Sequence, residues 1–145
     1  MESSLRNELE TKIEELKPTI NDDGTEIGYV FPTNAPEGAT RPYLVYTRIS
    51  TEKIKTLEGM TGKEYLSFMF SIMATRYGEM KELTKKIEKL LIDLPLKRLG
   101  PFYIEDLDIN NIHEVYEHEL KVNRGIIDFT IYFEEVEWWV KQLEH

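Results

Sequence analysis

Residues 64–74 read EYLSFMFSIMA, and this stretch decides the fold class because large apolar side chains recur at every second position. A period of two predicts a strand that buries one of its faces. We expect the inward face to consist of Leu66, Phe68, Phe70 and Ile72. The opposite face carries Tyr65, Ser67, Met69, Ser71 and Met73.

A second strand is predicted just upstream, over about residues 42–51, within the stretch RPYLVYTRIS at 41–50. Pro42 suits the start of a strand, where the ladder needs no hydrogen bond from it. Tyr43, Val45 and Ile49 occupy alternate positions, and we expect them to face the helices. Residues 53–62 contain two glycines and are interpreted as a loop. The two strands therefore predict a long antiparallel hairpin.

Two helices are also predicted. The first spans residues 4–17, ends before Pro18, and has an apolar stripe made of Leu5, Leu9, Ile13 and Leu16. The second spans residues 77–92 and has a stripe made of Met80, Leu83, Ile87, Leu90, Leu91 and Leu94. The Lys and Glu residues between these positions are interpreted as its solvated face.

The remaining segments predict shorter strands and a second hairpin. Residues 27–31 are expected to form a short strand, followed by an ordered loop at 32–42. Residues 95–111 are interpreted as irregular, with a short strand at 102–104. A hairpin is predicted from residues 112–121 and 125–134, joined by a turn at 123–125 in which Gly125 takes the left-handed conformation. Its last strand is expected to point inward through Ile127, Phe129, Ile131 and Phe133.

These elements predict an α+β fold: a mostly antiparallel sheet of about four to five strands with two main helices packed on one face. Within the 145 residues we expect a single domain over residues 1–142. Residues 143–145, Leu-Glu-His, resemble the start of an expression tag. The N-terminal stretch MESSLRNELE has neither a basic nor an apolar region, so no signal peptide is expected. No apolar run approaches the ~20 residues of a membrane span.

Composition and motifs narrow the functional classes. A formal net charge of -9 argues against a grip on phosphate backbones, and the absence of cysteine excludes disulfides and thiolate ligands. The chain has no GxSxG elbow, P-loop or GxGxxG motif. His113 and His118 are five residues apart, whereas the HExxH zinc motif needs a spacing of four. We expect a strand there, which would send the two rings to opposite faces. The sequence therefore predicts no catalytic residue, cofactor or metal.

The segment after the last strand is rich in large apolar residues. If it is helical, one stripe consists of Val136, Trp139, Val140 and Leu143. Two interpretations stay open. The stripe packs on its own domain, or it docks on another subunit, where tryptophan is a favoured anchor.

The order of these segments resembles a known family. The quoted stretches RPYLVYTRIS, TLEGMTGKEYLSFMFSIMATRYGEMKELTKKIEKLL and YEHELKVNRGIIDFTIYFEE follow an N-terminal helix and a loop with prolines. This pattern resembles the tail-completion proteins of long-tailed bacteriophages and prophages, also called head–tail joining or minor capsid proteins. The resemblance covers about residues 5–135. The positions that carry it are Pro42, Tyr43, Val45, Thr56, Gly59, Phe68, Phe70, Ala74, Tyr77, Phe129, Ile131 and Phe133.

The resemblance implies a non-enzymatic structural role. Proteins of this kind assemble as a ring, commonly a hexamer, between the tail tube and the head connector. The ring surrounds the DNA path without binding DNA specifically and has no membrane association. The location implied is the virion, at the head–tail junction, after assembly in the cytoplasm of the bacterial host.

The candidate assembly interface consists of loops and of the tryptophan pair, because loops on a rigid sheet are natural docking elements. The residues proposed for it are Thr56, Leu57, Glu58, Gly59, Phe102, Tyr103, Trp138 and Trp139. An alternative function is a small cytosolic binding or regulatory module that uses the open face of the sheet. A pocket lined by Tyr46, Arg48, Tyr65 and Met69 would support that alternative.

Overall fold

The computed structural model describes the backbone of residues 1–56 and 59–135, and the side chains of residues 1–49 and 63–135. The chain begins with helix α1 (Glu2–Lys12), the short 3-10 helix η1 (Glu14–Leu16) and a two-stranded ribbon of β1 (Thr19–Ile20) and β2 (Glu26–Ile27). Then follow β3 (Val30–Pro32), β4 (Tyr43–Thr56), β5 (Gly59–Ala74), α2 (Tyr77–Ile92), β6 (Arg98–Leu99), β7 (Phe102–Glu117) and β8 (Val122–Glu135).

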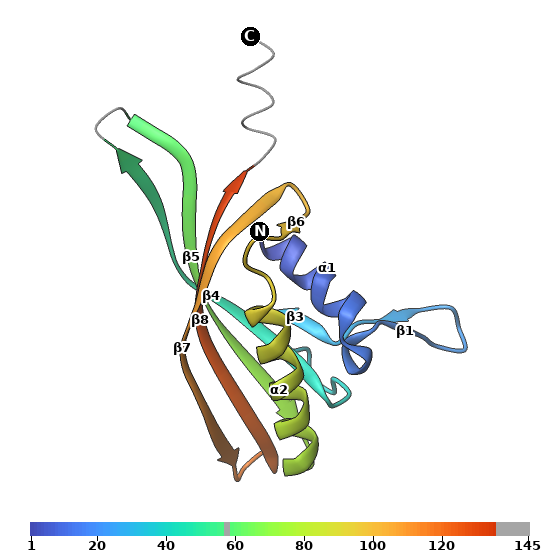
Figure 1. The fold of residues 1–145 in the computed structure, drawn as a ribbon. Coiled ribbons are helices and arrows are strands. Elements are labelled where there is room, and N and C mark those ends of the chain that lie inside the picture. The colour runs from blue at the N-terminus through green and yellow to red at the C-terminus, as the bar shows by residue number, and fades with distance from the viewer. Residues whose placement is uncertain (57–58, 136–145) are drawn as a thin grey trace.

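The main sheet has six strands in the order β3-β4-β5-β8-β7-β6. All neighbours in it are antiparallel except β3 and β4. The α+β class with two helices and a mostly antiparallel sheet is therefore confirmed, whereas the expected strand count of four to five is too low. The sheet is strongly curled (Figure 1).

The helices contact different parts of this curled sheet. Helix α2 packs against the central strands β5 and β8, whereas α1 contacts β3 and β6, which are the two edge strands. Contact with both edges is only feasible because the sheet curls around the core toward α1 (Figure 1). The bounds predicted for α2 match, but the first predicted helix is shorter and continues as η1.

The core contains the inward positions expected from the sequence. The predicted inward residues of β5 and β8 are all at most 5% exposed, as are those of α1 and η1. At its centre, the ring of Phe129 lies 4.7 Å from that of Phe70 and 5.6 Å from that of Phe68. The core cluster comprises Leu5, Leu9, Ile13, Leu16, Val30, Leu44, Leu66, Phe68, Phe70, Ile72, Leu83, Ile87, Leu91, Leu94, Leu99, Ile104, Ile127, Phe129, Ile131 and Phe133.

The face assigned to β4 from the sequence is wrong. Leu44 pairs with the buried Ile72 and is 0% exposed, whereas Ile49 is 59% exposed. Tyr46 also packs against the core, while Val45 lies on the opposite face. Because the side-chain period of a strand is two, the register with β5 decides the face, and β-branching alone does not.

Two segments interpreted as loops are strands. Residues 53–56 belong to β4 and residues 59–62 to β5, and the two strands pair as far as Thr56 and Gly59. Residues 95–111 contain β6 and the first part of β7. Strand β7 shows little apolar periodicity because it lies near the sheet edge and most of its side chains are exposed. Register shifts around Glu105 and Asn110 further disrupt its alternation.

The predicted turn at residues 123–125 is also wrong. The β7–β8 turn spans residues 118–121, and Lys121 takes the left-handed conformation with φ of 52°. Gly125 lies within β8, directly beneath α2. A Cβ atom there would collide with Thr84 Oγ1 and lie 2.9 Å from Met80 Sδ. Glycine is needed at this position because a helix and a strand approach closely, and a turn is not the reason.

Candidate assembly interface

Some of the residues predicted for the interface lie at one end of the sheet. Thr56 ends β4 and Gly59 begins β5, and the two residues pair across the hairpin. Phe102 and Tyr103 begin β7 and pair with the last two residues of β8. Since β5 pairs with this same end of β8, the structure brings the two pairs to the same end of the sheet (Figure 1).

Phe102 and Tyr103 differ in the surface they offer to a partner. The ring of Phe102 packs edge-on against Phe133, with ring centroids 5.1 Å apart. Phe102 is therefore partly committed to the core of its own chain. Tyr103 is 37% exposed and is the more accessible of the two residues. Their role in assembly stays a prediction.

The β4–β5 hairpin extends past this end of the sheet as a two-stranded arm (Figure 1). Strand β5 pairs with β8 from Lys63 onward, and before that point its residues Gly59 and Met60 pair with Thr56 and Lys55 of β4. The four residues 59–62, at about 3.3 Å each, give the arm a reach of roughly 13 Å beyond the paired sheet. An arm of this kind is suited to reach a neighbouring protein.

The other predicted interface residues are Leu57, Glu58, Trp138 and Trp139, and they lie outside the described residues. Their assignment to an interface, and the two interpretations of the tryptophan stripe, therefore stay predictions.

The sheet has two long stretches of backbone without a partner strand in the described chain. On one edge, β6 pairs with β7 only at its first two residues, and Ile104 is hydrogen-bonded to residues 96 and 97. From 106 to 117, β7 pairs with β8 alone. On the other edge, β3 pairs with β4 only as far as Tyr46, so residues 47–56 pair with β5 alone. Sequence reasoning missed both edges because it placed loops over part of each.

The free stretch of β7 also exposes apolar side chains. Ile112 is 37% exposed, Val115 is 40% exposed and Tyr116 is 46% exposed. Natural edge strands are usually protected by charged side chains, proline, bulges, shortness or a covering element. Residues 106–117 contain neither lysine nor proline, and their protection consists of four acids and the register shift around Asn110. The exposed apolar side chains on this edge are the feature that a partner in an assembly could cover.

Carboxylates line the same strand. Glu117 pairs with Arg124 at 3.2 Å and Glu105 pairs with Lys63 at 3.5 Å. Asp106 and Asp108 form no ion pair with any described residue. Partial burial raises the pKa of the neighbouring Tyr132, and the negative charge of Asp108 raises it further.

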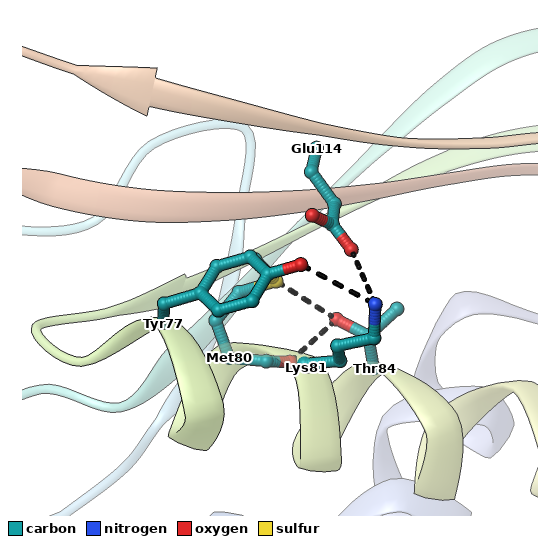
Figure 2. A network of polar contacts seen from close by, with 5 residues as sticks. All are labelled: Tyr77, Met80, Lys81, Thr84 and Glu114. Carbon is teal, nitrogen blue, oxygen red and sulfur yellow. Dashed lines mark hydrogen bonds and ion pairs between the residues drawn. The ribbon is translucent and has the colours of Figure 1, made fainter.

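An ion pair at the protein surface links helix α2 to β7 (Figure 2). Lys81 Nζ lies 3.6 Å from Glu114 Oε1 on β7 and donates to the Tyr77 hydroxyl at 3.3 Å. The hydrogen bond to Tyr77 is the largest cause of the raised pKa of Lys81, followed by the charge of Glu114. Thr84 Oγ1, one turn further, donates to Met80 O at 2.7 Å. This contact lies on the helix side of β7, and the outer edge of residues 106–117 has no partner strand among the described residues.

The pocket expected for a binding module does not form. Tyr46 and Arg48 pair with the inward Phe70 and Phe68, so they lie on the helix face of the sheet. Tyr65 and Met69 lie on the opposite face, because strand neighbours alternate. Arg48 is instead engaged by Glu2 of α1, at 3.5 Å.

The face opposite the helices carries a hollow that sequence reasoning did not find. It is lined by Thr33, Asn34, Ala35, Tyr43, Val45, Thr47, Met69, Ser71, Met73 and Arg124. Arg124 Nη2 donates to Ser71 Oγ at 2.8 Å, and its Nη1 donates to Glu117 Oε1 at 3.2 Å. The Arg124 guanidinium is thereby bound within the fold. This arrangement favours a structural role for Arg124.

The described residues contain no group of three or more His, Asp or Glu side chains that could hold a metal ion. His113 lies in β7, where its Nδ1 is 3.2 Å from the Asn111 side-chain nitrogen, and His118 lies in the turn that follows. No helix within residues 1–56 and 59–135 is long and apolar enough to cross a membrane.

The fold of this chain is similar to that of a chain in a solved structure. A chain of the structure described as "Virion of native gene transfer agent (GTA) particle" superposes with a TM-score of 0.68 at 12% sequence identity. The match covers 92% of this chain and 94% of that chain. At this identity the likeness establishes the fold. No curated protein matches the chain by sequence.

The family described as tail completion protein gp17 matches residues 24–134, which is most of the chain. The chain therefore belongs to the tail completion protein gp17 family, as the resemblance in its sequence indicated. It is a structural protein of the bacteriophage virion.

Proposed function

We propose that this protein completes the phage tail and joins it to the head connector, as a subunit of a ring, commonly a hexamer, around the DNA path. The observation that carries the proposal is the match of residues 24–134 to the tail completion family. The proposed role is non-enzymatic, and assembly takes place in the cytoplasm of the bacterial host before the protein becomes part of the virion.

The interface of the proposed ring includes the β4–β5 arm, around Thr56 and Gly59, and the start of β7 at Tyr103. Their position at one end of the sheet supports this assignment, because a common end can meet one partner. Trp138 and Trp139 are proposed to extend the same surface, since they follow the end of β8 in the sequence.

The acidic character of the chain suits a wall that faces DNA. A net charge of -9 repels phosphate, so DNA would slide past without being held. Asp106 and Asp108 are the strongest candidates on the described surface because they form no ion pair with a described residue of their own chain. Replacing both with asparagine is expected to slow DNA ejection from the particle. Unchanged infectivity would remove the support for this part of the proposal.

Native mass spectrometry with the tail-tube and connector proteins of the same phage tests the assembly role. We expect the chain alone to remain largely monomeric and to form a closed oligomer when a partner is added. A chain that stays monomeric with both partners present would contradict the proposal. A prophage deleted for this gene should yield tails and filled heads that remain separate in electron micrographs.

A further inference from the structure

The two free edges of the main sheet differ in charge. Residues 106–117 on β7 read DLDINNIHEVYE, with four acids and neither Lys nor Arg. Residues 47–56 on β4 read TRISTEKIKT, with three basic residues and one acid. Within the fold, Glu114, Glu117 and Arg48 already have partners of opposite charge. The charges that remain still differ in sign: Asp106 and Asp108 stay on β7, whereas Glu52, Lys53 and Lys55 in the sequence of β4 sum to +1.

We propose that the free edge of β7 (106–117) pairs with the free edge of β4 (47–56) of a second copy of this chain, so that the six-stranded sheets join head to tail. The inference rests on the proposed ring and names the contact that builds it. Each edge has backbone groups with no protein partner among the described residues, and pairing satisfies them. Joining two copies also covers the exposed apolar residues of β7.

The charges favour this pairing over two alternatives. Pairing β7 with β7 would set acids against acids, and like charges opposite each other in a sheet are destabilising. Pairing β4 with β4 would do the same with basic residues. Contact between two different edges is heterologous, and heterologous contacts close into rings when the rotation allows. Within one chain β7 runs antiparallel to β4, so a ring with a common strand direction gives an antiparallel contact.

The alternation of the ladder identifies which backbone groups of β7 point outward. The N–H of Leu107 donates to Asp106 Oδ1 at 2.9 Å, so it is directed away from β8. Leu107 pairs with Ile131 of β8. Because the two kinds of pair alternate along the ladder, the β7 residues opposite Phe129 and Ile127 also direct their N–H groups away from β8. Ile112, which pairs with Ile127, therefore directs its N–H outward, whereas His113 directs its N–H toward β8.

Cysteine cross-linking tests the pairing of the two edges. The chain contains no cysteine, so only introduced cysteines can form a disulfide. Thr47 and Asn111 belong to one row of paired residues across the sheet, in which Met69 and Asp128 lie between them. Both side chains are on the face opposite the helices. Within one chain, three strand spacings, or roughly 14 Å, separate them, which is too far for a disulfide. A disulfide must therefore join two copies.

Tails assembled from the double variant Thr47→Cys/Asn111→Cys are expected to give a ladder of covalent oligomers after mild oxidation. The stagger between the two copies decides which residue of β7 lies opposite Thr47. His113→Cys and Val115→Cys, on the same face as Asn111, are therefore each tested in place of Asn111→Cys. At least one of the three should cross-link. The matched control Thr47→Cys/Ile112→Cys should not, since Ile112 lies on the helix face. Each single-cysteine variant should remain monomeric on the gel.

The outcomes separate this inference from the proposed function. Oligomers in native mass spectra of the same tails without any same-face cross-link would overturn the edge pairing and leave the ring role standing. Equal cross-linking from both faces would overturn it as well. Tails that contain no oligomer of this chain would overturn the inference and the proposed ring together.

Proline provides a second test of backbone pairing. Ile112→Pro removes an outward N–H, so we expect the chain to fold but to lose oligomer formation at least tenfold. Ile112→Thr keeps that N–H and should assemble. Assembly by the proline variant, or loss of assembly in the threonine variant, would show that backbone pairing is not the contact. His113→Pro removes an N–H that faces β8 and should reduce the melting temperature as a control for folding.

Discussion

Replacing Gly125 with alanine tests the closest approach between α2 and β8. The new Cβ atom would collide with Thr84 Oγ1 and lie 2.9 Å from Met80 Sδ. Thr84 Oγ1 donates to Met80 O at 2.7 Å, so it cannot turn aside without taking the buried Thr84 hydroxyl from its acceptor. The flexible Met80 side chain can move, but the helix as a whole must shift to relieve the collision with Thr84.

The expected cost follows from two opposing effects. Overpacking a close-packed core destabilises by about 1–3 kcal/mol. A change from glycine to alanine in a strand returns about 0.5–1 kcal/mol through backbone entropy. We therefore expect the free energy of unfolding to fall by about 1–2 kcal/mol, with a melting temperature lower by roughly 3–8 °C. Urea unfolding followed by circular dichroism measures the change, and the m-value should stay constant.

Two further variants make the test specific. A Cβ at Gly78, which lies on α2, would meet nothing within 4 Å, so Gly78→Ala should stabilise the protein by up to about 1 kcal/mol. Thr84→Ala opens space above Gly125, so the double variant Thr84→Ala/Gly125→Ala should lose at least about 1 kcal/mol less than the sum of the single variants. A Gly125→Ala protein as stable as the parent would refute the reasoning.

Three other predictions concern the core, an ion pair and the C-terminal segment. Phe129→Ala empties the centre of the aromatic cluster, so the free energy of unfolding should fall by about 3–5 kcal/mol in urea titrations. A hydrogen bond from Lys86 lowers the pKa of Glu15 below its ordinary value of 4.5. The pair therefore stabilises the fold above about pH 4.5, and its contribution is lost as the pH falls through the lowered pKa. Lys86→Gln should accordingly destabilise the protein at pH 7, and its effect should shrink as the pH falls below 4.5. Replacing Trp138 and Trp139 with alanine should leave the melting temperature unchanged and weaken assembly. A lower melting temperature would instead place these side chains in the core of their own chain.

The sequence alone determined the elements whose burial repeats with a regular period. The alternation in EYLSFMFSIMA placed Phe68 and Phe70 inside, and the structure confirms both as buried. The same holds for Phe129 in β8 and for the bounds of α2. These predictions succeeded because a strand or helix with one buried face records that face locally in its own residues. The order of the segments and the positions that carry the resemblance were enough to indicate the tail completion family, which the family match confirms.

The tertiary structure decided the features that depend on contact with a neighbouring strand or helix. The register with β5 turned Leu44 inward and left Ile49 exposed, because one-residue steps exchange the two faces of a strand. Strand β7 could not be recognised from its sequence, since one neighbour and two register shifts leave it with little periodicity. Gly125 acquires its role only when α2 lies above it. The free edges of β4 and β7 among the described residues likewise exist only because the short strands β3 and β6 pair with one end of each, and no local pattern records which strands become neighbours.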